Sequence, residues 1–170
     1  MCPYAASTRS RRRADVGCWS RHPVSVDIWA SPPLDTRGYF DEERRDLLTL
    51  LDSLSASEWS AASSAEGWTV KDLALHLLDG DLGRLSRGRD GELTGVLKTR
   101  GTQGLAQALS VKNQRWLEAT RQLSPRVIQD LLRFSTDEVS AWTADDDLLG
   151  RAHVSWASDE PVPTWLDHAR

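Results

Sequence analysis

The sequence predicts an all-α fold, most simply an up-down helix bundle. Two observations support this prediction. Four segments repeat apolar residues at the three- and four-residue steps of a helix, and serine, threonine or proline stands at several of their starts. In contrast, no segment alternates apolar and polar residues in the manner of a half-buried strand.

The first helix is predicted over Gly38–Leu54, with Phe40, Leu47, Leu50, Leu51 and Leu54 as its apolar positions. A connection rich in serine and alanine follows at 55–68. The second helix is predicted from about Val70 to Ser86. Thr69 is its expected N-cap with Asp72 at the third position, and its buried stripe is expected to contain Val70, Leu73, Ala74, Leu77 and Leu78.

A glycine-rich loop is expected at Gly88–Gly104, before a third helix from about Leu105 to Gln122. A fourth helix is predicted from Pro125 to about Trp142, with Ser124 as its N-cap and Pro125 as its first residue. Its inward positions are expected to be Val127, Ile128, Leu131, Leu132 and Val139. Residues 148–163 are predicted to be extended, and Thr164 to cap one further helix start, with Asp167 at its third position.

The length and composition fit a single soluble domain of 170 residues, of which 39% are hydrophobic and 27% charged. No run of about 18 apolar residues is present, so we predict no membrane contact through a spanning helix. Both cysteines lie before residue 20, which excludes a disulfide framework and a thiolate zinc cluster.

The charge is distributed unevenly along the chain. The first 25 residues hold five arginines and one aspartate, whereas the remainder holds 16 basic and 24 acidic residues. An acidic body argues against nucleic acid as the main partner. We predict that residues 1–34 are a disordered leader or, as a variant of this reading, a mis-started one whose true start is a valine such as Val24 or Val26. A nucleic-acid arm or a targeting signal at 11–13 is the alternative, and the absence of a secretory signal predicts a cytoplasmic protein.

Few residues in the body are candidates for chemistry, because the sequence has no phosphate-binding glycine loop and no nucleophile elbow. His76 is the exception, since it falls on the flank of the second helix's apolar stripe. That position fits either a metal ligand between helices or an ordinary histidine at the core edge. The tryptophans, eight in all, are expected to pack the bundle, with an aromatic ligand box as the alternative.

Several short motifs together resemble the metal-binding N-terminal domain of mycothiol-dependent maleylpyruvate isomerases, a family of DinB-like four-helix bundles. The resemblance covers roughly residues 35–170, and its most specific part is the block from Gly67 to His76. The matching residues are Leu54-Ser55, Glu58-Trp59, Gly67–Leu73, His76-Leu77, Asn113–Trp116, Leu123–Arg126, Val154–Trp156 and Trp165–Asp167.

The resemblance implies a divalent metal, usually zinc, with His76 as one ligand, and mycothiol as thiol cosubstrate. It also implies two more ligands from a Glu-x-x-x-His pair on the last helix. That pair would lie beyond Arg170, so we expect the final helix to be truncated and residues 35–170 to form an incomplete bundle. His76 is then the one predicted metal ligand, with weak or absent zinc binding, and no catalytic residue is assigned.

Three functions follow as hypotheses. The first is a metal-binding domain of this family, truncated and catalytically impaired. The second is a non-catalytic helical interaction module, which binds a partner helix or self-associates at an open groove of the bundle. The third is a thiol-dependent transferase in its own right. Two of the three family ligands and the second domain of the characterised isomerases are missing from the sequence, so enzyme activity is left open.

Overall fold

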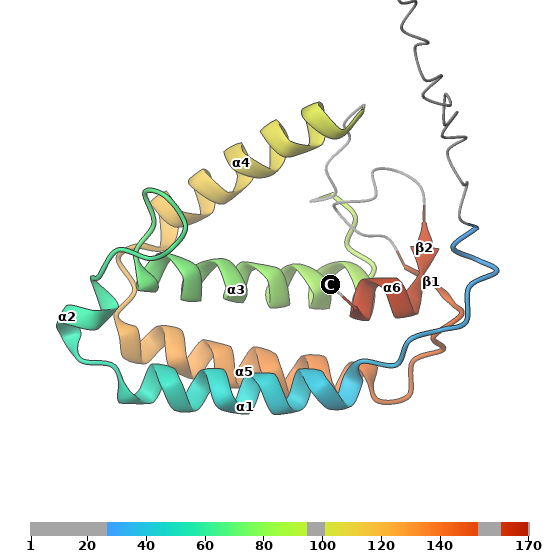
Figure 1. The fold of residues 1–170 in the computed structure, drawn as a ribbon, viewed down its shortest axis with the longest axis horizontal. Helices are drawn as coiled ribbons and strands as arrows, with labels where there is room; N and C mark the ends of the chain where they lie inside the picture. The colour runs from blue at the N-terminus through green and yellow to red at the C-terminus, as the bar shows by residue number, and fades with distance from the viewer. Residues whose placement is uncertain (1–26, 95–100, 153–160, 170) are drawn as a thin grey trace, which may run out of the picture.

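The computed structural model describes residues 27–94, 101–152 and 161–169, apart from the side chains of residues 101 and 102. It is an all-α protein, as predicted, and Figure 1 shows its helices running roughly along one axis. Four long helices form the body: α1 (Arg37–Ser53), α3 (Val70–Arg84), α4 (Gly101–Thr120) and α5 (Pro125–Thr143). In the described part of the chain, no helix is both long and apolar enough to cross a membrane.

The smaller elements lie at the two ends of the bundle. At one end is α2 (Ala56–Trp59), and at the other is a π-helical turn, η1 (Leu85–Arg89). Beside η1 are α6 (Thr164–His168) and two short antiparallel strands, β1 (Arg151–Ala152) and β2 (Val162–Pro163). Most of the predicted leader, with both cysteines, His22 and the basic run, lies outside the described residues, and so does His153.

The core forms where α3 packs on α5 and α5 packs on α1. Its fully buried members come from α3, α4 and α5, and α1 adds Leu51 at 3% exposure. Each such side chain contributes about 1.5–3 kcal/mol through the removal of apolar surface from water. The largest apolar members are Leu75, Leu78, Leu117, Ile128, Leu132 and Val139.

The sequence pattern predicts a wider buried face for α1 and α5 than the structure has. Leu50 is 57% exposed and Val127 is 42% exposed, although both were expected in the core. Leu50 lies 100° around the helix from the buried Leu51, and α1 has one principal neighbour, α5, so only a narrow stripe of α1 is covered.

The helix starts follow local capping chemistry in three places. The predicted caps at Thr69 and Ser124 are confirmed, since each hydroxyl accepts a hydrogen bond from the third residue of its helix. Ser55 and Glu58 form a further capping box, which produces α2 inside the predicted connection. The expected cap at Thr164 is wrong, because Thr164 is itself the first residue of α6 and its hydroxyl caps nothing.

The predicted loop at Gly88–Gly104 is shorter than expected at both ends. The π-helical turn carries the chain of α3 on to Arg89, and α4 already begins at Gly101. Gly88 is required in this turn, because a Cβ atom there would overlap the ring of Trp142 on α5. The close approach of backbone and indole fixes the end of α3 against α5.

A buried ionic network joins α1, α3 and α5. Asp81 of α3 is 1% exposed, and its carboxylate accepts hydrogen bonds from the Arg44 guanidinium of α1 at 2.7 Å and from the Ser135 hydroxyl of α5 at 3.0 Å. A buried charge is tolerated only with such partners, because desolvation of an unpaired ion costs several kcal/mol.

We predict that Asp81→Ala lowers the free energy of unfolding by about 3–5 kcal/mol, because Arg44 then stays buried without its carboxylate. Urea denaturation at pH 7 measures the change. The matched control is Asp52→Ala, which breaks an exposed ion pair with Arg133 and is expected to cost less than about 1 kcal/mol. Equal losses in the two variants would contradict the structural role of the network.

Candidate functional site

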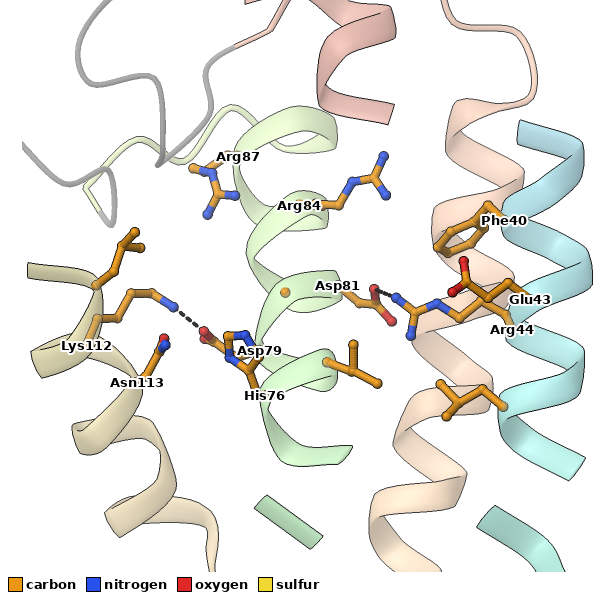
Figure 2. Close-up of a pocket in the computed structure, with 14 residues that line it drawn as sticks. Phe40, Glu43, Arg44, His76, Asp79, Asp81, Arg84, Arg87, Lys112 and Asn113 are labelled. Atoms are coloured by element: carbon orange, nitrogen blue, oxygen red, sulfur yellow. Dashed lines mark hydrogen bonds and ion pairs between the residues drawn. The ribbon is translucent and has the colours of Figure 1, made fainter. Parts of the chain in front are cut away.

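A cleft of about 600 Å³ runs along one face of α3, with walls from α1 and α4. Figure 2 shows His76 toward one end of this face of α3 and Arg87 toward the other. The cleft mixes apolar and charged side chains. Its lining residues are Phe40, Glu43, Arg44, Leu47, His76, Leu77, Asp79, Gly80, Asp81, Arg84, Arg87, Leu109, Lys112 and Asn113.

The block from Gly67 to Asp72 places His76 in this cleft. Gly67 has a φ of 77°, a left-handed conformation that favours glycine, and it turns the chain into the start of α3. Thr69 and Asp72 form a capping box that fixes the first turn of α3. Trp68 then lies with its ring edge-on to His76, at 5.3 Å between ring centroids. The residues that carry the family resemblance therefore position the histidine.

His76 is half-buried, and its surroundings favour the neutral imidazole. Burial is the largest cause and lowers its pKa, the carboxylate of Asp79 raises it in part, and the positive charge of Lys112 adds a smaller lowering. A neutral imidazole at pH 7 has a lone pair on one ring nitrogen. His76 can therefore accept a proton from a ligand or bind a metal ion.

A series of polar contacts holds one half of α4 against α3. The carboxylate of Asp72 is 2.9 Å from the Arg121 guanidinium, the Trp116 indole donates to the carbonyl of Leu75 at 2.7 Å, and Asp79 pairs with Lys112. In Figure 1, α4 slopes away from α3 toward its own N-terminal end.

Basic side chains outnumber acidic ones on the cleft wall, by four to three. The basic residues are Arg44, Arg84, Arg87 and Lys112, and the acidic ones are Glu43, Asp79 and Asp81. The guanidinium carbons of Arg44 and Arg84 lie 4.9 and 5.8 Å from the centre of the Phe40 ring. Two cations that share one aromatic ring need nearby anions, and Asp81 and Asp167 lie against them at 2.7 and 3.8 Å.

Gly80 lines the cleft, and a second glycine of α3, Gly83, follows it three residues later. A Cβ atom at Gly80 would have no heavy atom within 4 Å, so no packing contact requires glycine there. A Cβ atom at Gly83 would lie 2.8 Å from Nη1 of Arg87, so the missing side chain makes room for that guanidinium. Glycine inside a helix costs up to about 1 kcal/mol relative to alanine.

The described residues fall short of a complete zinc site. None of them form a group of three His, Cys, Asp or Glu side chains able to hold a metal ion. His76 has one carboxylate near it, that of Asp79, which pairs with Lys112. A catalytic zinc site takes three protein ligands. His168 does not supply another, because it is buried in the end of the bundle beside Asp146, 3.1 Å away.

The sequence prediction identified His76 and placed it beside Gly80, but it did not single out Arg87 or Lys112 as residues of the same cleft. Gly80, Gly83 and Arg87 follow at four, seven and eleven residues, which places all of them within about 40° of His76 on an ideal helix. A helical wheel drawn from the sequence alone shows this alignment. No local sequence pattern predicts that Lys112 lies in the cleft, because its position beside Asp79 depends on how α4 packs on α3.

Comparison with known protein families gives a match over most of the chain. The family model described as mycothiol maleylpyruvate isomerase N-terminal domain matches residues 40–169, which is most of the chain. Comparisons with curated proteins and with solved structures gave no match.

We predict that Asp72→Asn destabilises the protein at pH 7 by about 2 kcal/mol, because it removes a charge-assisted bond to Arg121 at the start of α3. Burial raises the pKa of Asp72, but Arg121 and Thr69 together bring it below 3.8. The stabilisation is therefore complete above the unfolded pKa and is lost as the pH falls through the lower, folded value.

Urea denaturation at several pH values between 7 and 2.5 tests this dependence. The difference between wild type and Asp72→Asn should shrink steadily below pH 4. The control is Asp130→Asn, which removes an exposed carboxylate on α5 and should change stability by less than about 1 kcal/mol. A difference that stays constant down to pH 2.5 would count against the ionised carboxylate as its source.

Proposed function

Because this chain belongs to the mycothiol maleylpyruvate isomerase N-terminal domain family, we propose that its cleft binds a thiol cosubstrate of the mycothiol type beside His76. The observation that carries the proposal is the half-buried imidazole, favoured in its neutral form, on the wall of a cleft of about 600 Å³. Clefts of about 300–1,000 Å³ are typical of small-molecule sites.

The charges of the cleft support a site for a thiol that ionises. A nearby cation favours the thiolate over the thiol and lowers the thiol pKa. Lys112 lies close enough to His76 to affect its pKa, so a thiol at that point would meet its positive charge, which the larger effect of the Asp79 carboxylate opposes. A ring nitrogen of neutral His76 is able to accept the thiol proton, which leaves an anion near Lys112.

His76 is also the residue through which the chain would hold a divalent metal, which we expect to be zinc. One imidazole and the neighbouring Asp79 carboxylate make a weak site, because three protein ligands are usual. The described residues therefore support binding of a thiol ligand more strongly than catalysis that depends on a tightly held metal ion. We accordingly assign no catalytic residue and propose that the domain by itself is catalytically impaired.

A second candidate function is a helical interaction module. The observation that favours it is the length of the cleft, which follows α3 from His76 to Arg87 between walls from α1 and α4. A helix is about 10 Å across, so a helix of a second copy of this chain is the occupant we consider. This function needs neither metal nor thiol.

We predict that zinc binds weakly and through His76. Isothermal titration calorimetry of the full chain with zinc should show weaker binding to His76→Ala, by a factor of at least about ten. A loss of about tenfold is already typical when a residue that only hydrogen-bonds to a metal ligand is removed. His22→Ala, which removes an imidazole from the predicted leader, should leave the affinity unchanged. Equal zinc affinity in wild type and His76→Ala would remove His76 from the metal site.

We predict that Gly80→Leu blocks the cleft without unfolding the protein, because the space around a Cβ atom at Gly80 is open. Titration with mycothiol should show binding to wild type and little or none to Gly80→Leu. Gly38→Leu, which adds the same side chain in open space at the start of α1, is the matched control.

The same two variants separate the second function from the first. Sedimentation in the presence of EDTA should show a monomer over the full range of concentrations if the cleft is a thiol site alone. A dimer that persists in EDTA and dissociates in Gly80→Leu, with no mycothiol binding to wild type, would favour the interaction module.

A further inference from the structure

We infer that Asn113 of α4 recognises an amide group close to the thiol of the ligand, so that the cleft selects thiols of the amide-bearing class. The inference rests on the proposed function and deepens it, because Asn113 lines the same cleft as His76, beside which the thiol is placed.

The first observation is the register in which α4 packs on α3. Three contacts between side chain and partner define it, and they join Arg121 to Asp72, Trp116 to Leu75 and Lys112 to Asp79. Residue numbers fall along α4 as they rise along α3, so the two helices run antiparallel. Asn113 and His76 both fall between the second and the third contact, and Figure 2 shows them on facing helices. A ligand that reaches His76 therefore passes the Asn113 amide.

The second observation is that the fold holds Asn113 on the cleft wall. Trp116 follows it by three residues, which places the two side chains on the same face of α4. The Trp116 indole donates to a carbonyl oxygen of α3 at 2.7 Å, and this bond fixes the rotation of α4 about its axis. Asn113 is half-buried in the cleft as a result. Both ends of the Asn113–Trp116 motif therefore contribute to the site.

The third observation is that the hydrogen-bonding groups of Asn113 are available to a ligand. In the described part of the chain its amide bonds to no other residue, whereas its neighbour Lys112 pairs with Asp79. A carboxamide has an acceptor oxygen and two N–H donors. A ligand amide has the same two kinds of group, so the two amides can each donate one hydrogen bond to the other. A neutral ligand group suits this point, because the two adjacent charges already neutralise each other.

Titration of the full chain with two thiol probes, followed by NMR, tests the inference. N-acetylcysteamine has an amide next to its thiol, and 2-mercaptoethyl acetate is the ester in which oxygen replaces the amide N–H. The measure is the ratio of their two dissociation constants in wild type and in Asn113→Leu, because the different hydration of the probes cancels in that comparison. We expect the preference for the amide probe to fall about two- to tenfold in Asn113→Leu, the range for one neutral hydrogen bond.

Three measurements separate amide recognition from general effects. Gln107→Leu makes the same change from an amide to leucine at an exposed position of α4 outside the cleft, and should keep the ratio of wild type. Asn113→Leu should melt at the temperature of wild type or above it, because leucine is the better helix former. His76→Ala should weaken the binding of both probes, which reports on the thiol position alone.

The outcomes distinguish the inference from the proposed function. An equal ratio in wild type and Asn113→Leu overturns the inference, even if the affinity for both probes falls together. If the ratio is equal and His76→Ala still weakens both probes, the thiol site stands without amide recognition. If wild type binds neither probe, the proposed function fails and the inference fails with it.

Discussion

The bond between Asp72 and Arg121 is the interaction on which the site depends most. Asp72 caps α3 through Thr69 and so fixes the rotation of the whole helix about its axis. The same carboxylate holds the C-terminal end of α4 against the N-terminal end of α3. One buried residue thus sets both the direction in which His76 points and the distance between two walls of the cleft. A substitution of Asp72 would therefore disturb the residues of the cleft, although Asp72 itself does not line it.

Asp81 has the complementary role on the opposite side of α3. It follows Asp72 by nine residues, which is half a turn around the helix. Its partners, Arg44 and Ser135, belong to α1 and α5, so this carboxylate fixes α3 to the rest of the bundle while Asp72 fixes it to α4. Two carboxylates in α3 therefore determine the geometry of the bundle, and the apolar core supplies the bulk of the stability between them.

The sequence predicted the parts of this architecture that depend on local chemistry. Helix starts at Thr69 and Ser124 follow from capping residues, and the motifs around the block from Gly67 to His76 identified the family. It could not predict which apolar residues of α1 stay exposed, as Leu50 does, because that depends on how few neighbours α1 has. The Lys112–Asp79 pair and the π-helical turn at Gly88 escaped prediction for the same reason, since both result from contacts between helices distant in sequence.

Two glycines lower the helix propensity of α3 beside the proposed ligand site. Two glycines within one turn cost that helix up to about 1 kcal/mol each, and no tight turn or positive φ requires either of them. A packing explanation fails at Gly80, where the space is open, whereas at Gly83 the missing side chain gives Arg87 its place. Selection for stability alone would favour alanine at both positions. The open space at Gly80 lies beside His76 and fits the ligand site that we propose there.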